Sequence, residues 1–123
     1  MRGHINNTVI PVWLADGRAA LFREKLGSKI PTMVVNLNVD FRRELHWGSM
    51  VTARTAVERI GNSSIVFVQE LWQNDQVCVQ ARTTVIAVDV ETRQSMRVPD
   101  EERTLLSPYL LSTKPTPPSP QAL

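Results

Sequence analysis

The sequence predicts an α+β domain in which one long apolar helix is followed by a curved antiparallel sheet of four long strands. Apolar residues near the amino terminus recur at the three- and four-residue steps of a helix. Later segments are patterned as strands, three of them reaching roughly ten residues, about twice the usual length. Their connections are short, which favours antiparallel neighbours, and a twisted sheet of this length can curve around a helix.

The predicted helix runs from Val9 to Leu26. Pro11 lacks a backbone donor and places the helix start close by, with Thr8 or Asn7 as the cap. Gly27 is the expected stop. The first half is apolar nearly all round, so we expect it to be buried on several sides. One face is lined by residues at helical spacing, namely Ile10, Trp13, Leu14, Gly17 and Leu21.

Four strands are predicted after the helix: Met33–Phe41, Met50–Ile60, Ser64–Gln73 and Val77 to about Val90. The first alternates strictly, which gives it one apolar face. Residues 61–63 and 74–76 have the composition of tight turns. Pro99, followed by acidic residues, marks the start of a short terminal helix.

Composition limits the organisation and the partners of the chain. Five of the eight prolines follow residue 107, so we interpret 112–123 as a Pro-rich flexible tail and 1–111 as one domain. The net charge of +2 and the absence of a basic and aromatic cluster argue against nucleic acid, and no apolar run is long enough to span a membrane. Cys78 is the only cysteine, and no secretory leader precedes Gly3, so we expect a cytoplasmic protein.

The pentapeptide Gly3-His4-Ile5-Asn6-Asn7 leads straight into the helix and resembles the Gly-His-Val-Asn-Asn signature of the hot dog fold acyl-CoA thioesterases related to 4-hydroxybenzoyl-CoA thioesterase. The likeness covers about residues 3–106. It continues through Arg18, Val39-Asp40-Phe41, Gly61-Asn62-Ser63-Ser64 and the segment 88–99. It implies a hot dog fold, here without the usual first strand because only Met1 and Arg2 precede Gly3.

This resemblance implies that the thioester carbonyl is held by the backbone amide of Asn7, with Gly3, His4 and Asn6 shaping the turn. Free N–H groups and the positive end of the helix dipole stabilise an oxygen that gains negative charge, by about 3 kcal/mol. The alternative is that the two asparagines only cap the helix and turn the chain.

The family normally carries an Asp three positions before the glycine, which attacks the thioester or activates water. Here that position falls ahead of Met1, as it would in a shortened form, in a degenerate relative, or with a start placed too late. Asp16 is the best substitute, since a related branch of hot dog enzymes places an acid on this helix. Its competing interpretation is a solvated or paired acid near Arg18 or Arg23.

Basic side chains are candidates to meet the phosphates of coenzyme A, some of them across a subunit boundary. The candidates are Arg42, Arg43, Arg59 and Arg82, and Ser63 and Ser64 are candidates to line the pantetheine channel. The competing interpretation is that these side chains are only solvated. Two histidines and one cysteine at distant positions make no metal site, and His46 is most simply a packing or surface residue.

We therefore predict an acyl-CoA thioester hydrolase that needs no cofactor or metal. The sheet leaves an outer face and edges exposed, so we expect a homodimer or a homotetramer. The alternative is a non-catalytic acyl-thioester-binding or dimerisation module that lacks the family's Asp. A hot dog hydratase or dehydratase is less favoured, because no Asp and His pair is found beside His4.

Overall fold

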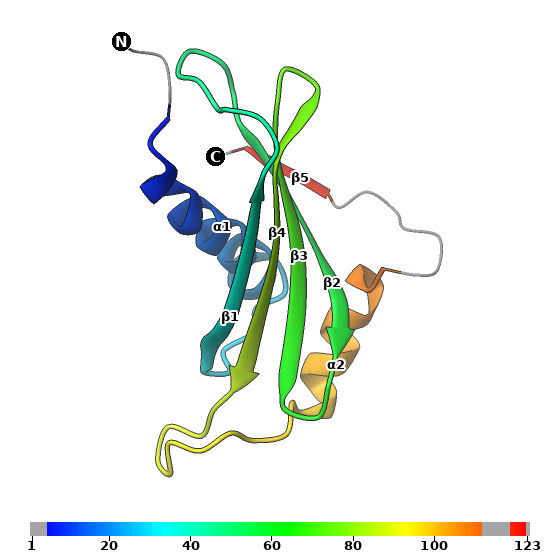
Figure 1. Cartoon of the computed structure of the whole chain (residues 1–123). Coiled ribbons are helices and arrows are strands. Elements are labelled where there is room, and N and C mark those ends of the chain that lie inside the picture. Colours follow the sequence, from blue (N-terminus) through cyan, green and yellow to red (C-terminus); the bar gives the residue numbers. More distant parts are fainter. Residues whose placement is uncertain (1–4, 112–118, 123) are drawn as a thin grey trace.

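The predicted helix and strands all form in the computed structural model, which describes residues 5–111 and 119–122 (Figure 1). A 3-10 turn, η1 (Asn7–Val9), leads into α1 (Ile10–Ala19), and α1 continues as a π-helical segment, η2 (Ala20–Lys25). The cap is Asn6, one residue before the range predicted, because the 3-10 turn extends the helix start. Pro11 lies in the first turn of α1, where no backbone donor is needed.

One antiparallel sheet carries the rest of the fold. Its long strands are β1 (Thr32–Phe41), β2 (Thr52–Ile60), β3 (Ser64–Gln73) and β4 (Gln76–Ala87). The order across the sheet is β1-β4-β3-β2-β5, so β4 lies between β3 and β1. Asn74 and Asp75 join β3 to β4 with φ angles of 51° and 60°, as a two-residue turn of type I′ requires.

The core lies between the sheet and the helices in two clusters. The upper cluster includes Ile10 and Leu14 of α1 with Leu71 of β3, and the lower one includes Leu21 and Phe67. α2 (Asp100–Leu106), followed by the 3-10 turn η3 (Ser107–Tyr109), covers the lower end. Strand β3 contributes to the core along its whole length, since every second residue along it is buried.

The helix is buried on one side only. Its predicted face is confirmed, with Ile10, Leu14, Gly17 and Leu21 buried and Trp13 partly buried against the core. The expectation that its first half is buried on several sides is wrong, because Val12 is 57% exposed. α1 packs on β2 and β3, and the residues on its other side, Val12, Ala15 and Ala19, are exposed in the described chain.

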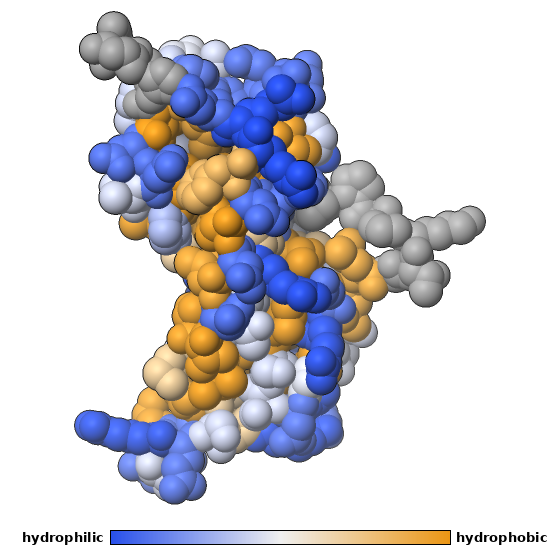
Figure 2. Space-filling model, in the orientation of Figure 1, coloured by the Kyte–Doolittle hydropathy of each residue, from blue (hydrophilic) through white to orange (hydrophobic). Residues whose placement is uncertain are grey.

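β1 forms where the alternation predicts it, but its apolar residues are not covered. A bulge at Val35 shifts the register between Val34 and Asn36, so the strictly alternating face is split between the two sides of the sheet. Met33, Val34 and Phe41 are each about half exposed. Figure 2 shows the resulting hydrophobic surface along this edge of the molecule.

The carboxyl-terminal segment adds one short edge strand. β5 (Ser119–Ala122) pairs antiparallel with β2 from Thr52 to Thr55. These residues lie within 112–123, the tail whose proline content predicts flexibility, and that flexibility stays a prediction. Among the described residues no helix is long and apolar enough to cross a membrane.

Candidate functional site

The turn that enters the helix is fixed by its own backbone. The N–H of Ile5 donates to the carbonyl of Leu45 at 2.8 Å, and the buried Ile5 side chain joins the upper core. The side chain of Asn6 accepts hydrogen bonds from the Thr8 amide at 2.9 Å and from the Thr8 hydroxyl at 3.0 Å. Asn6 therefore acts as the cap, and its carboxamide oxygen is already occupied.

Asn7 is placed differently from its neighbour. It is exposed, and its carbonyl accepts a hydrogen bond from the Ile10 amide. Its own N–H has no acceptor among the described residues. An exposed, unpaired N–H at the amino end of a helix can bind an oxygen that carries negative charge. Gly3 and His4, which are predicted to shape this turn, lie outside the described residues.

Asp16 lies on the exposed side of α1, and no ion pair joins it to Arg18 or Arg23 in the described chain. It follows Asn7 by nine positions, which corresponds to about 13 Å along a helix. A carboxylate that attacks a bound carbonyl must come within about 3.5 Å of it. Within one chain, Asp16 therefore does not share a site with the Asn7 amide.

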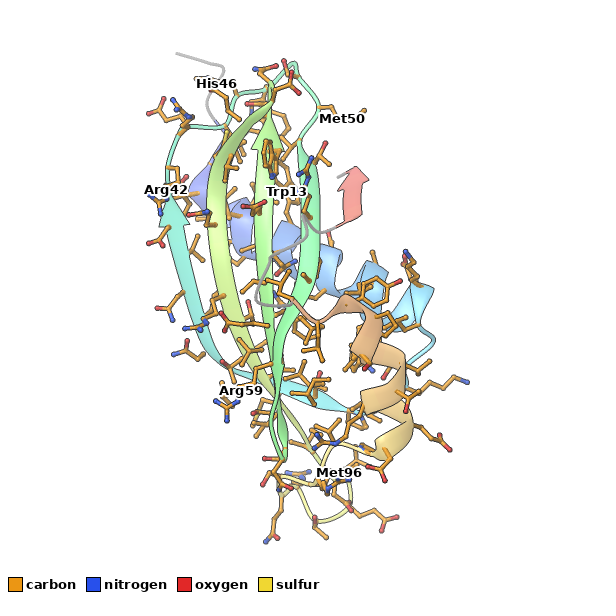
Figure 3. All side chains as sticks on the ribbon, turned by 90° about the vertical axis from the view of Figure 1, so that its right-hand side faces the viewer. Trp13, Arg42, His46, Met50, Arg59 and Met96 are labelled. Atoms are coloured by element: carbon orange, nitrogen blue, oxygen red, sulfur yellow. The ribbon has the colours of Figure 1, made fainter. Side chains whose placement is uncertain are left out.

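The loop after β1 lies at the same end of the molecule as the helix start (Figures 1 and 3). The amides of Arg42 and Arg43 both donate to the Cys78 carbonyl, at 2.7 and 3.1 Å. Buried Gln73 holds the loop further along, since its side chain bonds both the N–H and the carbonyl of His46. These bonds fix the backbone from which the two arginines project.

Two open cavities adjoin these arginines. One, of about 490 Å³, is lined by Arg42, Arg43, Val77 and Gln80. The second, of about 320 Å³, lies beside Arg43, His46 and Cys78. Arg42 is oriented by its Nε, which donates to the Gln80 side chain at 3.0 Å. Two of the arginines that the sequence singles out, Arg42 and Arg43, therefore border open cavities near the helix start.

The other predicted basic and serine residues do not join this group. Arg59 lies at the opposite end of the sheet from Arg42 (Figure 3), and the hairpin that carries Ser63 and Ser64 follows it there. Arg82 donates through Nε at 2.7 Å to Glu58, so its charge is already paired. Within one chain the candidates therefore do not form one site, because Arg42 and Arg43 lie at one end of the sheet and Arg59, Ser63 and Ser64 lie at the other (Figures 1 and 3).

A buried network around Arg18 was not predicted from the sequence. Arg18 Nη1 donates to Gln69 Oε1 and to Thr83 Oγ1, each at 3.2 Å. Gln69 Nε2 donates in turn to the Leu14 carbonyl at 2.8 Å and to Thr55 Oγ1 at 3.1 Å. The signal was available, because Gln69 stands where the alternation of β3 calls for a buried apolar residue.

Burial lowers the pKa of the Arg18 guanidinium, because desolvation disfavours the charged form. Arginine nevertheless remains protonated at neutral pH. Among residues 5–111 and 119–122, no group of three His, Cys, Asp or Glu side chains is arranged to hold a metal ion.

Comparison with known proteins defines the class to which this fold and site belong. Residues 2–80 match the family model described as the thioesterase superfamily. A predicted thioesterase from Bacillus stearothermophilus has 32% identity and a TM-score of 0.80, over 89% of this chain and 86% of that chain. The chain therefore belongs to the thioesterase superfamily, and its fold is the predicted hot dog fold.

More distant structures share the fold. The probable thioesterase YbaW from Escherichia coli has 21% identity and a TM-score of 0.73, over 88% of this chain and 87% of that chain. A thioesterase complexed with coenzyme A and Zn from Thermus thermophilus has 18% identity and a TM-score of 0.71, over 87% of this chain and 81% of that one. No curated protein sequence matches the chain. Membership of the superfamily supports thioester hydrolysis as the general activity.

Proposed function

We propose that this protein hydrolyses acyl-CoA thioesters and that the Asn7 amide binds the thioester carbonyl oxygen. The observation that carries the proposal is the exposed, unpaired N–H of Asn7 at the helix start of a thioesterase superfamily chain. Negative charge develops on that oxygen during attack, and a fixed N–H stabilises it more in the transition state than in the ground state. The role of Gly3, His4 and Asn6 is to shape the turn that presents this amide.

Coenzyme A is the proposed thiol carrier. The Thermus thermophilus thioesterase that shares the fold is described with coenzyme A bound. In this chain Arg42 and Arg43 border open cavities at the end of the sheet that carries the helix start, where they would meet the phosphates. Arg59, Ser63 and Ser64 lie at the other end, so they contribute only if another subunit brings them close. Arg82 would first have to leave Glu58.

A second copy of the chain is proposed to pair with β1. This strand is an edge of the sheet, and its backbone is free to form a further antiparallel ladder. It also exposes large apolar side chains on both sides of the sheet, namely Met33, Val34, Val35, Leu37 and Phe41. A long apolar edge strand is a template for pairing with another chain, and two identical antiparallel edges satisfy twofold symmetry. The product is a homodimer, and the outer sheet face remains available for a tetramer.

The carboxylate is proposed to come from that second copy. Asp16 is too far along the helix to reach a carbonyl held at Asn7 of its own chain. An Asp16 supplied by the neighbouring subunit would act as nucleophile or as the base that activates water. Asp16 is suited to this because it is exposed and has no ion-pair partner in the described chain.

The test is hydrolysis of a panel of acyl-CoAs, followed by reaction of the released thiol with a colour reagent. The wild-type chain should release thiol, and Asp16→Asn should lower kcat by about a hundredfold or more. Glu101→Gln is the matched control, since Glu101 is exposed on α2, away from the helix start and the two arginines, and should leave kcat unchanged. Failure of the wild-type chain to release thiol from any acyl-CoA would contradict the proposal.

A non-catalytic acyl-thioester-binding module is the second candidate. The observation that favours it is the absence of any acidic residue from the first turns of η1 and α1, next to Asn7. This candidate predicts that acyl-CoAs bind, as measured by calorimetry, but are not turned over. It also predicts that Asp16→Asn has no effect on binding.

A further inference from the structure

A small cavity lies between the lower half of the helix and the sheet, away from the Asn7 amide. It has a volume of about 170 Å³, close to the cavity of about 150 Å³ that holds a benzene molecule in an engineered protein. Its walls are mainly apolar, and Arg18 and Arg23 are its two charged residues. The lining is Ala15, Arg18, Ala19, Phe22, Arg23, Thr32, Val34, Phe67 and Val85.

The two arginines differ in how fully their donors are used. Arg23 holds the connection from η2 to β1, since its guanidinium donates to the carbonyls of Ser28 and Ile30 at 3.3 and 2.6 Å. Arg18 is bound through one nitrogen only, Nη1. Its Nε and Nη2 have no acceptor in the described chain, and they are not among the described buried atoms that lack a partner. These two donors are therefore accessible.

Arg18 is also held in place before any ligand arrives. The acceptors of Nη1 are Gln69 and Thr83, which are 2% and 0% exposed, and Gln69 is itself fixed by its bonds to Leu14 and Thr55. No carboxylate of the described chain pairs with Arg18. A half-buried guanidinium with no counter-charge and a free pair of donors matches the geometry of a carboxylate.

The cavity connects to the helix start by an exposed apolar path. Val12, Ala15 and Ala19 follow one another at three- and four-residue steps on the uncovered side of the helix. Leu37 and Phe41 are exposed on the side of β1 that faces the helix. Asn7 and Arg18 are eleven residues apart, about 16 Å along the axis. A long acyl chain whose thioester lies at Asn7 would therefore end at Arg18.

We infer that Arg18 selects acyl thioesters whose acyl chain ends in a carboxylate. This inference rests on the proposed function for the position of the thioester. The chain would lie along the apolar path, its last carbons would fill the cavity, and the terminal carboxylate would accept hydrogen bonds from Arg18 Nε and Nη2. Removal of a charge-assisted pair of this kind lowers affinity by about tenfold to a hundredfold.

The test compares dodecanedioyl-CoA, which has a free terminal carboxylate, with lauroyl-CoA, which has the same chain length. Wild type should show a kcat/KM at least about tenfold higher for dodecanedioyl-CoA. Arg18→Gln should remove this preference, Arg18→Lys should restore part of it, and the exposed Arg93→Gln should leave it unchanged. Because the readout is a ratio of two substrates, a general loss of activity in a variant does not affect it.

A binding measurement separates this inference from the proposed function. Calorimetry would use thioether analogues of dodecanedioyl-CoA and lauroyl-CoA, which cannot be hydrolysed. Tighter binding of the dicarboxylic analogue to wild type supports the inference even if no acyl-CoA is hydrolysed. Equal binding of the two analogues overturns it, whether or not Arg18→Gln folds. An Arg18→Gln variant that weakens the dimer while keeping the substrate preference also overturns it, because Arg18 would then pair with an acid of the second copy.

Discussion

Strands β3 and β1 are both ten residues long and rich in apolar side chains, but they lie in opposite surroundings. β3 is the centre of the sheet, with α1 across one face and every second side chain buried. β1 is an edge strand whose residues are exposed or only partly buried along its whole length. Alternation therefore predicts the backbone conformation of a strand, whereas the neighbours in three dimensions decide whether its apolar face is covered.

The difference separates residues that stabilise the fold from residues that are available for binding. The buried face of β3 supplies Phe67 and Leu71 to the two core clusters. The same kind of side chain on β1 remains exposed in the single chain, at a free sheet edge. The proposed division is that β3 provides stability and β1 provides the surface for assembly and substrate, and the following variants test it.

The largest expected effect comes from shortening a leucine in the core. Leu71→Ala in β3 removes a fully buried side chain and should lower the free energy of unfolding by about 2–5 kcal/mol. Leu37→Ala on β1 is the matched control. Leu37 is 39% exposed, so in dilute solution its loss should be below about 1 kcal/mol. Urea unfolding measures both.

Repeating the unfolding measurements at high protein concentration tests whether β1 also takes part in association. If β1 joins two copies, the cost of Leu37→Ala should grow at high protein concentration, because association stabilises the folded state by mass action. Equal losses for the two variants in dilute solution would contradict the division between the two strands.

The next effect concerns the free edge. Val35→Lys places a charge at the bulge of β1 and should raise the dimer dissociation constant by about tenfold or more, because an edge lysine opposes strand pairing. Analytical ultracentrifugation measures it. Val90→Lys is the matched control, since Val90 is exposed in the loop after β4 and should leave the dimer intact. Dimerisation of Val35→Lys with unchanged affinity would place the interface elsewhere.

A smaller effect is expected on the side of the helix that packs against β2 and β3. A Cβ at Gly17 would lie 2.9 Å from Gln69 Nε2 and 3.2 Å from Thr55 Oγ1. The crowding costs about 1–3 kcal/mol, and the higher helix propensity of alanine returns about 1 kcal/mol. Gly17→Ala should therefore lower the free energy of unfolding by roughly 1 kcal/mol.

The exposed side of the helix provides the comparison for Gly17. Ala15→Gly changes helix propensity without any packing term and should cost about 1 kcal/mol. Thermal unfolding of the two variants measures the difference. A Gly17→Ala variant more stable than wild type would show that the helix does not approach the sheet this closely.

The smallest effect lies outside both strands, at the start of α2. The Arg97 guanidinium donates to Asp100 at 2.8 Å and holds the pKa of that carboxyl below its ordinary value of 3.8. A lowered pKa gives stability above pH 3.8 that is lost as the pH falls through the folded-state pKa. Asp100→Asn should therefore have a slightly lower Tm than wild type at neutral pH, and the two Tm values should converge below pH 3.8. A gap that stays constant with pH would contradict this pairing.

Much of the fold could be predicted from the sequence because its signals are local. Periodicity located the helix and the four long strands to within a few residues, and Asn74-Asp75 marked a turn that needs positive φ angles. The signature ending in Asn6 and Asn7 led to the helix start, and the role of the Asn7 amide there stays a prediction. The cap itself and the π-helical end of the helix were missed, since they depend on the packing of neighbouring residues.

The candidate site was less predictable, because its members are distant in sequence. Arg42 and Arg59 looked equivalent as exposed arginines, yet they lie at opposite ends of the sheet. Arg82 looked available but is paired with Glu58 on β2, across the intervening strand β3. Gln69 and Thr83 carry no recognisable sequence motif, yet their side chains fix Arg18 beside a cavity.

The sequence by itself determined the elements of this protein and the family to which it belongs, because helical and strand periodicity and a short signature are properties of neighbouring residues. Only the tertiary structure decided which apolar faces are covered, which charges are paired and which donors remain free. Those outcomes depend on strand order, register and the direction in which the sheet curves, and these bring together residues from separate elements. Arg18 and the exposed face of β1 acquire their proposed roles only at that level.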